Sequence, residues 1–299
     1  MQKARQRVIA IVGPTAVGKS ALAVELARRL NGEVISADSR QVYRGLDAGS
    51  GKITKREMRG VPHHLLSVAN PRKQFSAAIY KELAEKKIRE ILLRGKIPII
   101  CGGTGLYLDV LSGRVRIPNV PPDPALRKRL SVKTAHELFA LLATLDRARA
   151  NAIDRHNPRR LIRAIEIATE LGSVPPPHHS HILQNMRMIG LVLPPRKLRK
   201  RIQTRLTSRM RKMIAEVKRL HAKGLSWRRM EELGLEYRYL SRYLRGLITK
   251  AEMVQKLQTE IWRYAKRQLR WFRRNRAIRW FRPDEKRKIY AMMKREMGD

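Results

Sequence analysis

The sequence predicts an α/β protein in which a parallel sheet is covered by helices on both faces. Compact apolar runs, typical of buried strands, alternate with longer segments whose apolar residues repeat at helical spacing. Strand–helix–strand alternation of this kind favours a parallel sheet. The chain has 299 residues, of which 43% are hydrophobic, so it can bury a sizeable core.

The predicted elements alternate along the first third of the chain, and a further strand follows near residue 190. The strands are expected at 8–12, 33–36, 97–101 and 188–193. The helices are expected at 19–30, 76–94 and 157–171 and, in the basic second half, at about 198–220 and 250–274. We infer that this pattern continues through most of the chain.

A proline-rich stretch, IPNVPPDP at 117–124, interrupts the alternation. The leucine- and alanine-rich segment after it has a helical pattern and contains no strand candidate. Asn157 and Pro158 then predict a helix start, with Asn157 as the N-cap and Pro158 in the first turn. We therefore expect a core at 1–117, a helical insertion at 118–156, and the rest of the core at 157–299.

The charge of the chain points to a polyanionic partner. Lys and Arg number 66 against 25 Asp and Glu, a formal net charge of +41. The stretch 263–288 holds twelve Lys and Arg and two acids, with Trp271, Phe272, Trp280 and Phe281 among them. Cations interleaved with aromatics suit a phosphate backbone and unstacked bases. The alternative is that the aromatics face the core and only the charges face water.

The cysteine count and the apolar runs bear on the compartment. Cys101 is the only cysteine, so no internal disulfide can form, which fits a reducing compartment. The apolar run near the start is too short for a signal peptide, and no stretch is long enough to span a membrane. We expect a cytoplasmic protein without a membrane partner, and a monomer.

The stretch GPTAVGKS predicts a phosphate-binding loop, because it matches G-x-x-x-x-G-K-[ST] between an apolar strand and an amphipathic helix. It comprises Gly13, Pro14, Thr15, Ala16, Val17, Gly18, Lys19 and Ser20. The glycines let backbone N–H groups converge on an anion, and the helix N-terminus adds positive potential. Lys19 adds a full charge, and the Ser20 hydroxyl suits Mg²⁺. The motif indicates a diphosphate or a triphosphate without deciding between them.

Two further candidates follow other predicted strands. Asp38 comes directly after the second strand, and Thr104, in GGTGLY at 102–107, follows the third. The carboxyl ends of parallel strands line one crevice, so both side chains should lie beside the phosphate loop. A carboxylate there could take a proton from a nucleophile or hold a metal through water.

These motifs occur in an order that resembles the tRNA isopentenyltransferase family, the tRNA dimethylallyltransferases, over nearly the whole chain. The ordered set is GPTAVGKS, DSRQVY (38–43), PHHLL (62–66), GGTGLY, NPRRLIRAIEI (157–167), LEYRYL (235–240) and YAKRQLRWFRR (264–274). The resemblance implies a fold like that of P-loop kinases, with a helical insertion that closes on RNA. It implies transfer of a dimethylallyl group from dimethylallyl diphosphate to N6 of the adenosine 3′ of the tRNA anticodon, with Mg²⁺ as cofactor.

The resemblance also implies roles for particular residues. Asp38 would be the general base, and Thr104 would contact the substrate nucleotide. Residues 13–20 would bind the donor diphosphate, with Lys19 stabilising the leaving group. Contacts with the tRNA anticodon stem-loop are implied for Asp38, Ser39, Arg40, Gln41, Thr104, Arg127, Pro158, Arg159, Arg160, Leu161, Ile162, Arg238 and Arg267.

The chain departs from the usual family pattern at a few positions. Glu236 stands where the family usually has glycine, and Ser67 and Asn70 stand where acids are common. None of these changes removes a predicted catalytic group. The motif does not define a role for His63 and His64, and HHSH at 178–181 lacks the cysteine or nearby acid expected of a metal site.

Three other functions share part of this pattern. A small-molecule kinase would use the same loop and the same Asp38, but it does not need the basic C-terminal stretch. An adenylate isopentenyltransferase would perform the same chemistry on a free nucleotide, whereas the charge favours a polymeric acceptor. A non-catalytic RNA-binding protein would have no reason to keep Lys19, Ser20, Asp38 and Thr104 together.

Overall fold

The computed structural model of the chain describes residues 8–175 and 186–297, so HHSH at 178–181 lies outside the described residues. The chain forms two compact units, Met1–Ser112 with His181–Asp299, and Gly113–Ser180. No described helix is both long enough and apolar enough to cross a lipid bilayer.

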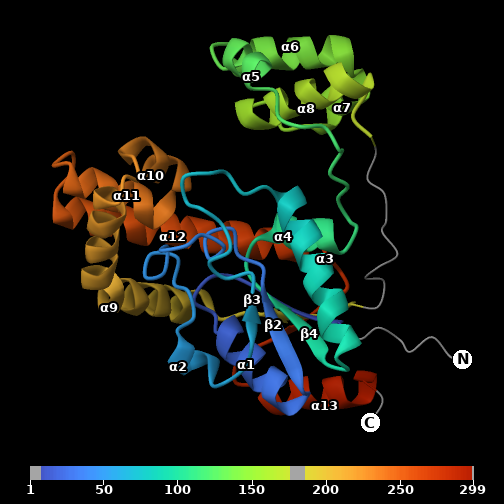
Figure 1. Cartoon of the computed structure of the whole chain (residues 1–299), viewed down its shortest axis with the longest axis vertical. Helices are drawn as coiled ribbons and strands as arrows, with labels where there is room; N and C mark the ends of the chain where they lie inside the picture. The colour runs from blue at the N-terminus through green and yellow to red at the C-terminus, as the bar shows by residue number, and fades with distance from the viewer. Residues whose placement is uncertain (1–7, 176–185, 298–299) are drawn as a thin grey trace, which may run out of the picture. The chain divides into compact units, whose positions relative to one another are not determined.

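The first unit is built on a six-stranded sheet in which every neighbouring pair is parallel. The strand order is β3-β2-β4-β1-β5-β6 (Figure 1). The strands are β1 (Val8–Val12), β2 (Gly32–Ser36), β3 (His63–His64), β4 (Ile97–Cys101), β5 (Met186–Leu191) and β6 (Ile278–Phe281). The prediction of a parallel sheet is confirmed, and so are its four predicted strands. The edge strands β3 and β6 were not predicted, because each is short and neither is a continuous apolar run.

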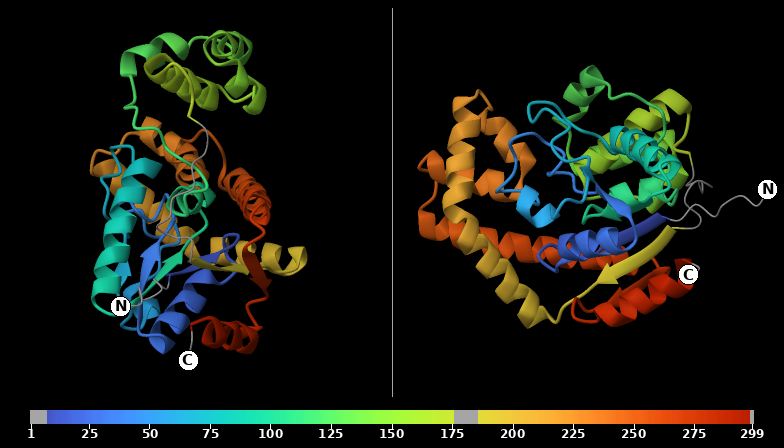
Figure 2. Two further views of the ribbon diagram at one scale, coloured as in Figure 1. Left: turned by 90° about the vertical axis from the view of Figure 1, so that its right-hand side faces the viewer. Right: turned by 60° about the horizontal axis from the view of Figure 1, so that its bottom comes forward.

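Helices cover both faces of this sheet. They are α1 (Lys19–Arg29), α2 (Lys55–Met58), α3 (Ala77–Leu93), α4 (Gly105–Leu111), α9 (Pro195–Ala222), α10 (Trp227–Leu233), α11 (Leu235–Leu244), α12 (Lys250–Arg273) and α13 (Lys286–Met297). Ile9 and Ile11 share a core with α1, α9 and α10 to α13, whereas Val8 and Ala10 share the other core with α3 and α4. The long helices α9 and α12 contact each other on the face of the sheet that carries Ile9 and Ile11 (Figure 2).

The second unit is a small helical body with its own core. It contains α5 (Pro124–Leu130), α6 (Ala135–Leu145), α7 (Arg147–Ala152) and α8 (Pro158–Leu171). Asn157 caps α8 by accepting from the Arg160 N–H, and Pro158 lies in its first turn, as predicted. The prediction ended the insertion at residue 156, but α8 packs Leu161 and Ile165 against Leu138 and Leu142 of α6. This shared core places α8 in the insertion.

The aromatics of the basic C-terminal stretch serve packing. Phe272 is a core residue at 3% exposure, and Trp280 packs on the same cluster from β6. The Trp271 Nε1–H donates to Asp109 Oδ2 (2.9 Å), and the indole lies against Gly105, where a Cβ would come within 2.2 Å of it. Phe272 therefore fits the alternative in which the aromatics face the core, because its ring is buried against the sheet.

Candidate active site

The phosphate loop connects β1 to α1 at the carboxyl edge of the sheet. Gly13 has φ 137°, and a Cβ there would lie 2.5 Å from the carbonyl oxygen of Leu191, so only glycine fits. Gly18 has φ 112° and forms the N-cap of α1 without a side-chain cap. Ser20 lies in the first turn of that helix. The loop therefore has the strand–loop–helix context that an anion site requires.

Lys19 is held inside this loop. Its Nζ donates to the carbonyl oxygen of Pro14 (2.7 Å). Burial lowers the pKa of Lys19 to about 8, although the nearby Cys101 and Asp38 oppose that shift. A bound anion would favour the charged form of Lys19, so the structure provides a cation that a phosphate ligand would stabilise.

Gln268 of α12 ties the phosphate loop to the glycine-rich turn after β4. Its Oε1 accepts from the Thr15 N–H (2.8 Å), and its Nε2 donates to the Gly103 carbonyl oxygen (2.9 Å). The side chain is buried, and a Cβ on Gly103 would lie 2.1 Å from its Nε2. The glycine is therefore required so that one side chain can fix both loops.

Asp38 lies two residues past the end of β2. As predicted, it is beside the phosphate loop, because it lines the same cavity as Lys19 and Ser20. Its Oδ1 accepts from the backbone N–H groups of Arg40 (2.8 Å) and Gln41 (3.3 Å). The neighbouring Ser39 N–H donates to Thr104 Oγ1 (3.0 Å). These contacts bring Asp38 and Thr104 to adjoining loops and orient the Asp38 carboxylate without using a cation.

An inner cavity of about 160 Å³ collects these side chains. Asp38, Lys19 and Ser20 line it together with Arg205 of α9 and Glu236 of α11. Burial raises the pKa of Glu236 to about 7, with a further contribution from the charge of Asp38, whereas Arg205 and Arg40 oppose the shift. Burial and the nearby Arg209 lower the pKa of Arg205.

The wall of the inner cavity is completed by the loop Asp47–Gly51. The buried Glu216 carboxylate of α9 accepts from the N–H groups of Asp47 (2.8 Å), Ala48 (2.7 Å) and Gly49 (3.0 Å). The Tyr237 hydroxyl donates to the same carboxylate (2.8 Å). Four donors on one buried carboxylate fix the loop, and Gly49, Ser50 and Gly51 line the cavity.

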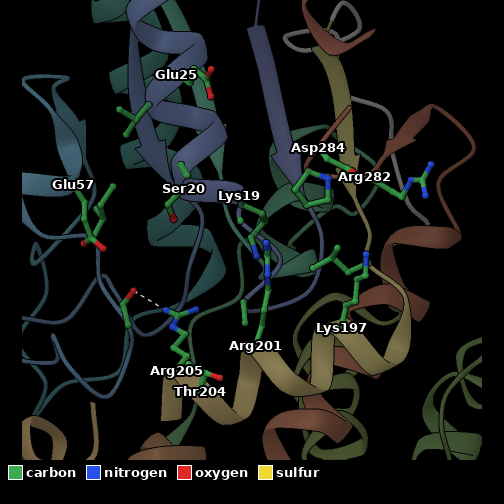
Figure 3. Close-up of a pocket in the computed structure, with 18 of the residues that line it drawn as sticks. Lys19, Ser20, Glu25, Glu57, Lys197, Arg201, Thr204, Arg205, Arg282 and Asp284 are labelled. Carbon is green, nitrogen blue, oxygen red and sulfur yellow. Dashed lines mark hydrogen bonds between the residues drawn. The ribbon is translucent and has the colours of Figure 1, made fainter. Parts of the chain in front are cut away.

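A larger outer cavity of about 1100 Å³ opens on the other side of the phosphate loop. It shares Lys19, Ser20, Gly51 and Arg205 with the inner cavity. Figure 3 shows Arg205 and Arg201 reaching from α9 toward the side of the loop that carries Lys19 and Ser20. The two cavities thus meet at Lys19 and Ser20 of the phosphate loop.

Comparisons with known proteins agree on one family. Residues 41–275 match the model of the family described as IPP transferase. The tRNA dimethylallyltransferase 1 of Hahella chejuensis is 43% identical over 270 residues, which cover 90% of this chain and 88% of that protein. The chain belongs to the IPP transferase family.

Solved structures of similar proteins share this fold. The tRNA isopentenylpyrophosphate transferase of Bacillus halodurans superimposes with a TM-score of 0.73 at 38% identity, covering 98% of this chain and 97% of that one. A eukaryotic dimethylallyltransferase acting on tRNA gives a TM-score of 0.74 at 25% identity, covering 89% and 69%. The match covers a smaller share of that enzyme because its chain is longer.

Several residues that the family resemblance assigned to tRNA make internal contacts in this IPP transferase. Arg127 donates through Nε to Glu166 Oε1 (2.6 Å) and through Nη2 to Oε2 (2.8 Å), and the Glu166 carboxylate is buried. Arg238 donates to the Glu231 carbonyl oxygen. Leu161 is fully buried in the helical core, so its side chain is not available to RNA. Leu161 belongs to the apolar face of the amphipathic helix α8, with Ile165 and Ala168, which explains its burial.

The other assigned positions keep accessible side chains. Pro158, Arg159 and Arg160 are exposed at the start of α8, and Ile162 is half-buried. Arg267 is exposed on α12, with its guanidinium 5.9 Å from the ring centre of Tyr264. Ser39, Arg40 and Gln41 line the inner cavity with Asp38. These positions stay predictions as RNA contacts.

Sequence reasoning missed Arg205, Glu236 and Gln268 as members of the inner cavity. Gln268 and Glu236 lie inside the quoted motifs YAKRQLRWFRR and LEYRYL, so the motifs marked the segments but not the side chains. Arg205 lies in a helix with many cations, and nothing local in the sequence distinguishes it from them. His64 is explained by structure, because its Nε2 lies 2.7 Å from Glu33.

Proposed function

We propose that this chain transfers a dimethylallyl group from dimethylallyl diphosphate to N6 of the adenosine 3′ of the anticodon in tRNA. The observation that carries the proposal is the inner cavity, where Asp38 lies beside Lys19 and Ser20 of the phosphate loop. A base and a diphosphate site that share one cavity suit a displacement of diphosphate by a nucleophile. Tyr264, Glu236 and Gln41 also line that cavity and provide polar and aromatic surface for a base.

The donor would bind with its diphosphate on the phosphate loop. Lys19 and Arg205 line both cavities beside the N–H groups of the phosphate loop and would surround the same anion. Negative charge grows on the diphosphate as its oxygen separates from the allyl carbon, so these groups stabilise the transition state more than the ground state. The carbon becomes cation-like, and the small inner cavity limits its access to water.

The acceptor amine would lie against Asp38. The N6 lone pair forms the new bond to C1 of the allyl group while the C1–O bond breaks, and its electron pair leaves with diphosphate. N6 then gives its proton to Asp38, whose orientation is fixed by the Arg40 and Gln41 N–H groups. The adenine must leave the anticodon loop to reach this cavity, which costs a few kcal/mol or so. The formal charge of +41 favours binding to the tRNA backbone, which can offset that cost.

Mg²⁺ is part of the proposal, and the residues present fit it. The Ser20 hydroxyl and the Asp38 carboxylate are hard oxygen donors in the same cavity. The described residues contain no group of three His, Cys, Asp or Glu side chains that could cage a metal. Ser20, diphosphate oxygens and water would therefore hold the ion, which when bound neutralises charge on the leaving group. We also propose that the enzyme acts as a monomer in the cytoplasm, with tRNA as its acceptor.

The test is product formation from unmodified tRNA transcripts, dimethylallyl diphosphate and Mg²⁺. Nucleosides released from the tRNA are identified by mass spectrometry, and transcripts with the target adenosine replaced serve as the control. We expect one prenylated adenosine beside the anticodon and release of one diphosphate. Absence of this product, together with ATP turnover on a small acceptor, would overturn the proposal in favour of a kinase.

A further inference from the structure

The outer cavity is larger and more basic than a single diphosphate requires. Its volume is about 1100 Å³, against about 160 Å³ for the inner cavity. Nine Lys and Arg side chains line it, against the three acids Glu25, Glu57 and Asp284. A concave surface with this excess of one charge concentrates the opposite charge from solution. The excess extends well beyond the phosphate loop.

The cations of α9 form a line that leads away from the loop. Lys197, Arg201 and Arg205 are spaced four residues apart, so they lie on one face of the helix. Figure 3 shows them rising from successive turns beside the cavity. With a rise of 1.5 Å per residue, the backbones of Lys197 and Arg205 are about 12 Å apart. This distance is longer than a diphosphate group, so the line has room for more than one anion position.

Arg201 and Arg205 of this line are hydrogen-bonded to the loop region, whereas Lys197 and its neighbour Lys200 are not. Arg201 Nη1 donates to the Val17 carbonyl oxygen (3.1 Å), and Arg205 Nη2 donates to that of Gly51 (3.0 Å). Within residues 8–175 and 186–297, neither Lys197 nor Lys200 has a hydrogen-bond or ion-pair partner. Both are exposed and line the outer cavity.

Two further features of the outer cavity attract anions. Arg282 is a third cation beside Lys197 and Lys200, and the N-terminus of α9 adds a partial positive charge. Arg282, in the turn between β6 and α13, lines the cavity. Its backbone N–H donates to Glu285 Oε2 (2.8 Å), whereas its guanidinium Nε lies 3.9 Å from that oxygen. Asp284 lies in the same turn, and Lys286 is paired with Glu25 (2.7 Å). The 28-residue helix α9 begins here without a side-chain cap, and Pro194 and Lys197 both line the cavity. Its free N–H groups add to the attraction for an anion.

We propose that Lys197, Lys200 and Arg282 form a second diphosphate site, the outer anion station, distinct from the phosphate loop. It takes the diphosphate group of the donor before the donor reaches Lys19, and it holds inorganic diphosphate after release from the loop. The assignment of its ligand rests on the proposed function. The station raises the local concentration of donor and speeds its capture without contacting the reacting atoms.

The site is tested first by binding, without tRNA. Equilibrium dialysis of labelled inorganic diphosphate against the full chain should give two diphosphates per chain for the wild type. Lys19→Ala should leave one, Lys197→Ala/Lys200→Ala should leave one, and the triple variant should leave none. Lys212→Ala/Lys218→Ala removes the same charge from exposed positions of α9 outside the cavity and should still give two. One diphosphate in the wild type and none in Lys19→Ala would overturn the station.

Kinetic measurements then show whether the station binds the diphosphate group of the donor or the inorganic diphosphate that leaves. At saturating tRNA, Lys197→Ala/Lys200→Ala should raise the KM for the donor about three- to tenfold, with less than about a twofold change in kcat. Inhibition by added inorganic diphosphate should weaken by a similar factor. A change in inhibition alone assigns the station to the leaving diphosphate, and a change in neither overturns it. Two bound diphosphates without any prenylated tRNA would instead overturn the proposed function and leave the station standing.

Discussion

The two ends of strand β2 carry carboxylates that are held in opposite ways. Glu33, near the start of the strand, is 3% exposed and contacts His64 Nε2 (2.7 Å), Arg94 Nη2 (2.7 Å) and Lys96 Nζ (3.0 Å). Asp38, just past the other end, is held through Oδ1 by two backbone N–H groups and lines the inner cavity. The same strand thus presents a carboxylate paired with cations and a carboxylate held by neutral donors.

Under the proposed function, the difference separates a structural carboxylate from one that can accept a proton. Burial by itself would raise the pKa of Glu33, but hydrogen bonds from Lys96, His64 and Arg94 outweigh it and lower the pKa to about 2. Such a carboxylate is a fixed ion that cannot accept a proton near neutral pH. Neutral N–H donors orient Asp38 and leave its other oxygen to a ligand. The carboxyl ends of parallel strands favour this arrangement, because loops there supply free N–H groups.

Replacing the reactive carboxylate should have the largest effect. Asp38→Asn should lower the single-turnover rate of prenyl transfer by about 1,000-fold, because the proton acceptor is lost while the N–H contacts to Oδ1 remain possible. Binding of tRNA and the melting temperature should change little, which filter binding and thermal unfolding would show. A collapse of RNA binding in this variant would mean that Asp38 has a different role.

Replacing the structural carboxylate should affect stability and not chemistry. Glu33→Gln should lower the free energy of unfolding by about 2–4 kcal/mol, since Arg94, Lys96 and His64 lose the buried carboxylate that they share. The rate per folded molecule should stay at the wild-type value. Urea unfolding and active-site-normalised turnover measure the two. An equal loss of both would erase the contrast between the two ends of the strand.

The pH dependence of stability sharpens the same point. A carboxylate whose folded pKa is lowered contributes stability above its unfolded pKa and loses it as pH falls through its folded pKa. For Glu33 the window runs from the ordinary value of 4.5 down to about 2. The wild type should therefore lose stability across this range more steeply than Glu33→Gln does. Parallel curves for the two proteins would contradict the ion-pair assignment.

Glu216 lies between the two cases, because it is buried and held by neutral donors but lines neither the inner nor the outer cavity. Glu216→Gln should lower kcat/KM about tenfold, since an amide nitrogen would face N–H donors and disturb the loop Asp47–Gly51. Tyr237→Phe removes only one of the four donors and should have a smaller effect. An equal effect of both variants would show that the loop contacts do not matter.

The smallest predicted effect is the titration of Lys19. Its free-state pKa of about 8 means that an anionic donor meets a neutral amine more often as pH rises above 8. The dissociation constant for the donor should increase about three- to tenfold between pH 7 and pH 9. Lys19→Arg keeps its charge throughout and should show a flatter curve, even if its affinity is lower. Calorimetric titration at fixed ionic strength provides the comparison.

The sequence by itself determined the elements whose signals are local. The phosphate loop, the strand before it and the helix after it follow from the consecutive residues 8–30, with their fixed spacing. Asp38 and Thr104 were predictable because strand ends in a parallel sheet meet at one edge. The N-cap and first-turn proline of α8 are also local signals, and the structure confirms them.

Only the tertiary structure decided which distant side chains complete the site. Gln268 reaches Thr15 across 253 positions, and Arg205 reaches Gly51 across 154. The same holds for Leu161, Phe272 and Arg127, whose burial or pairing depends on which helices pack together. Local pattern fixes where a helix begins and which face is apolar. Packing between remote elements decides what that face meets, and no spacing along the chain records it.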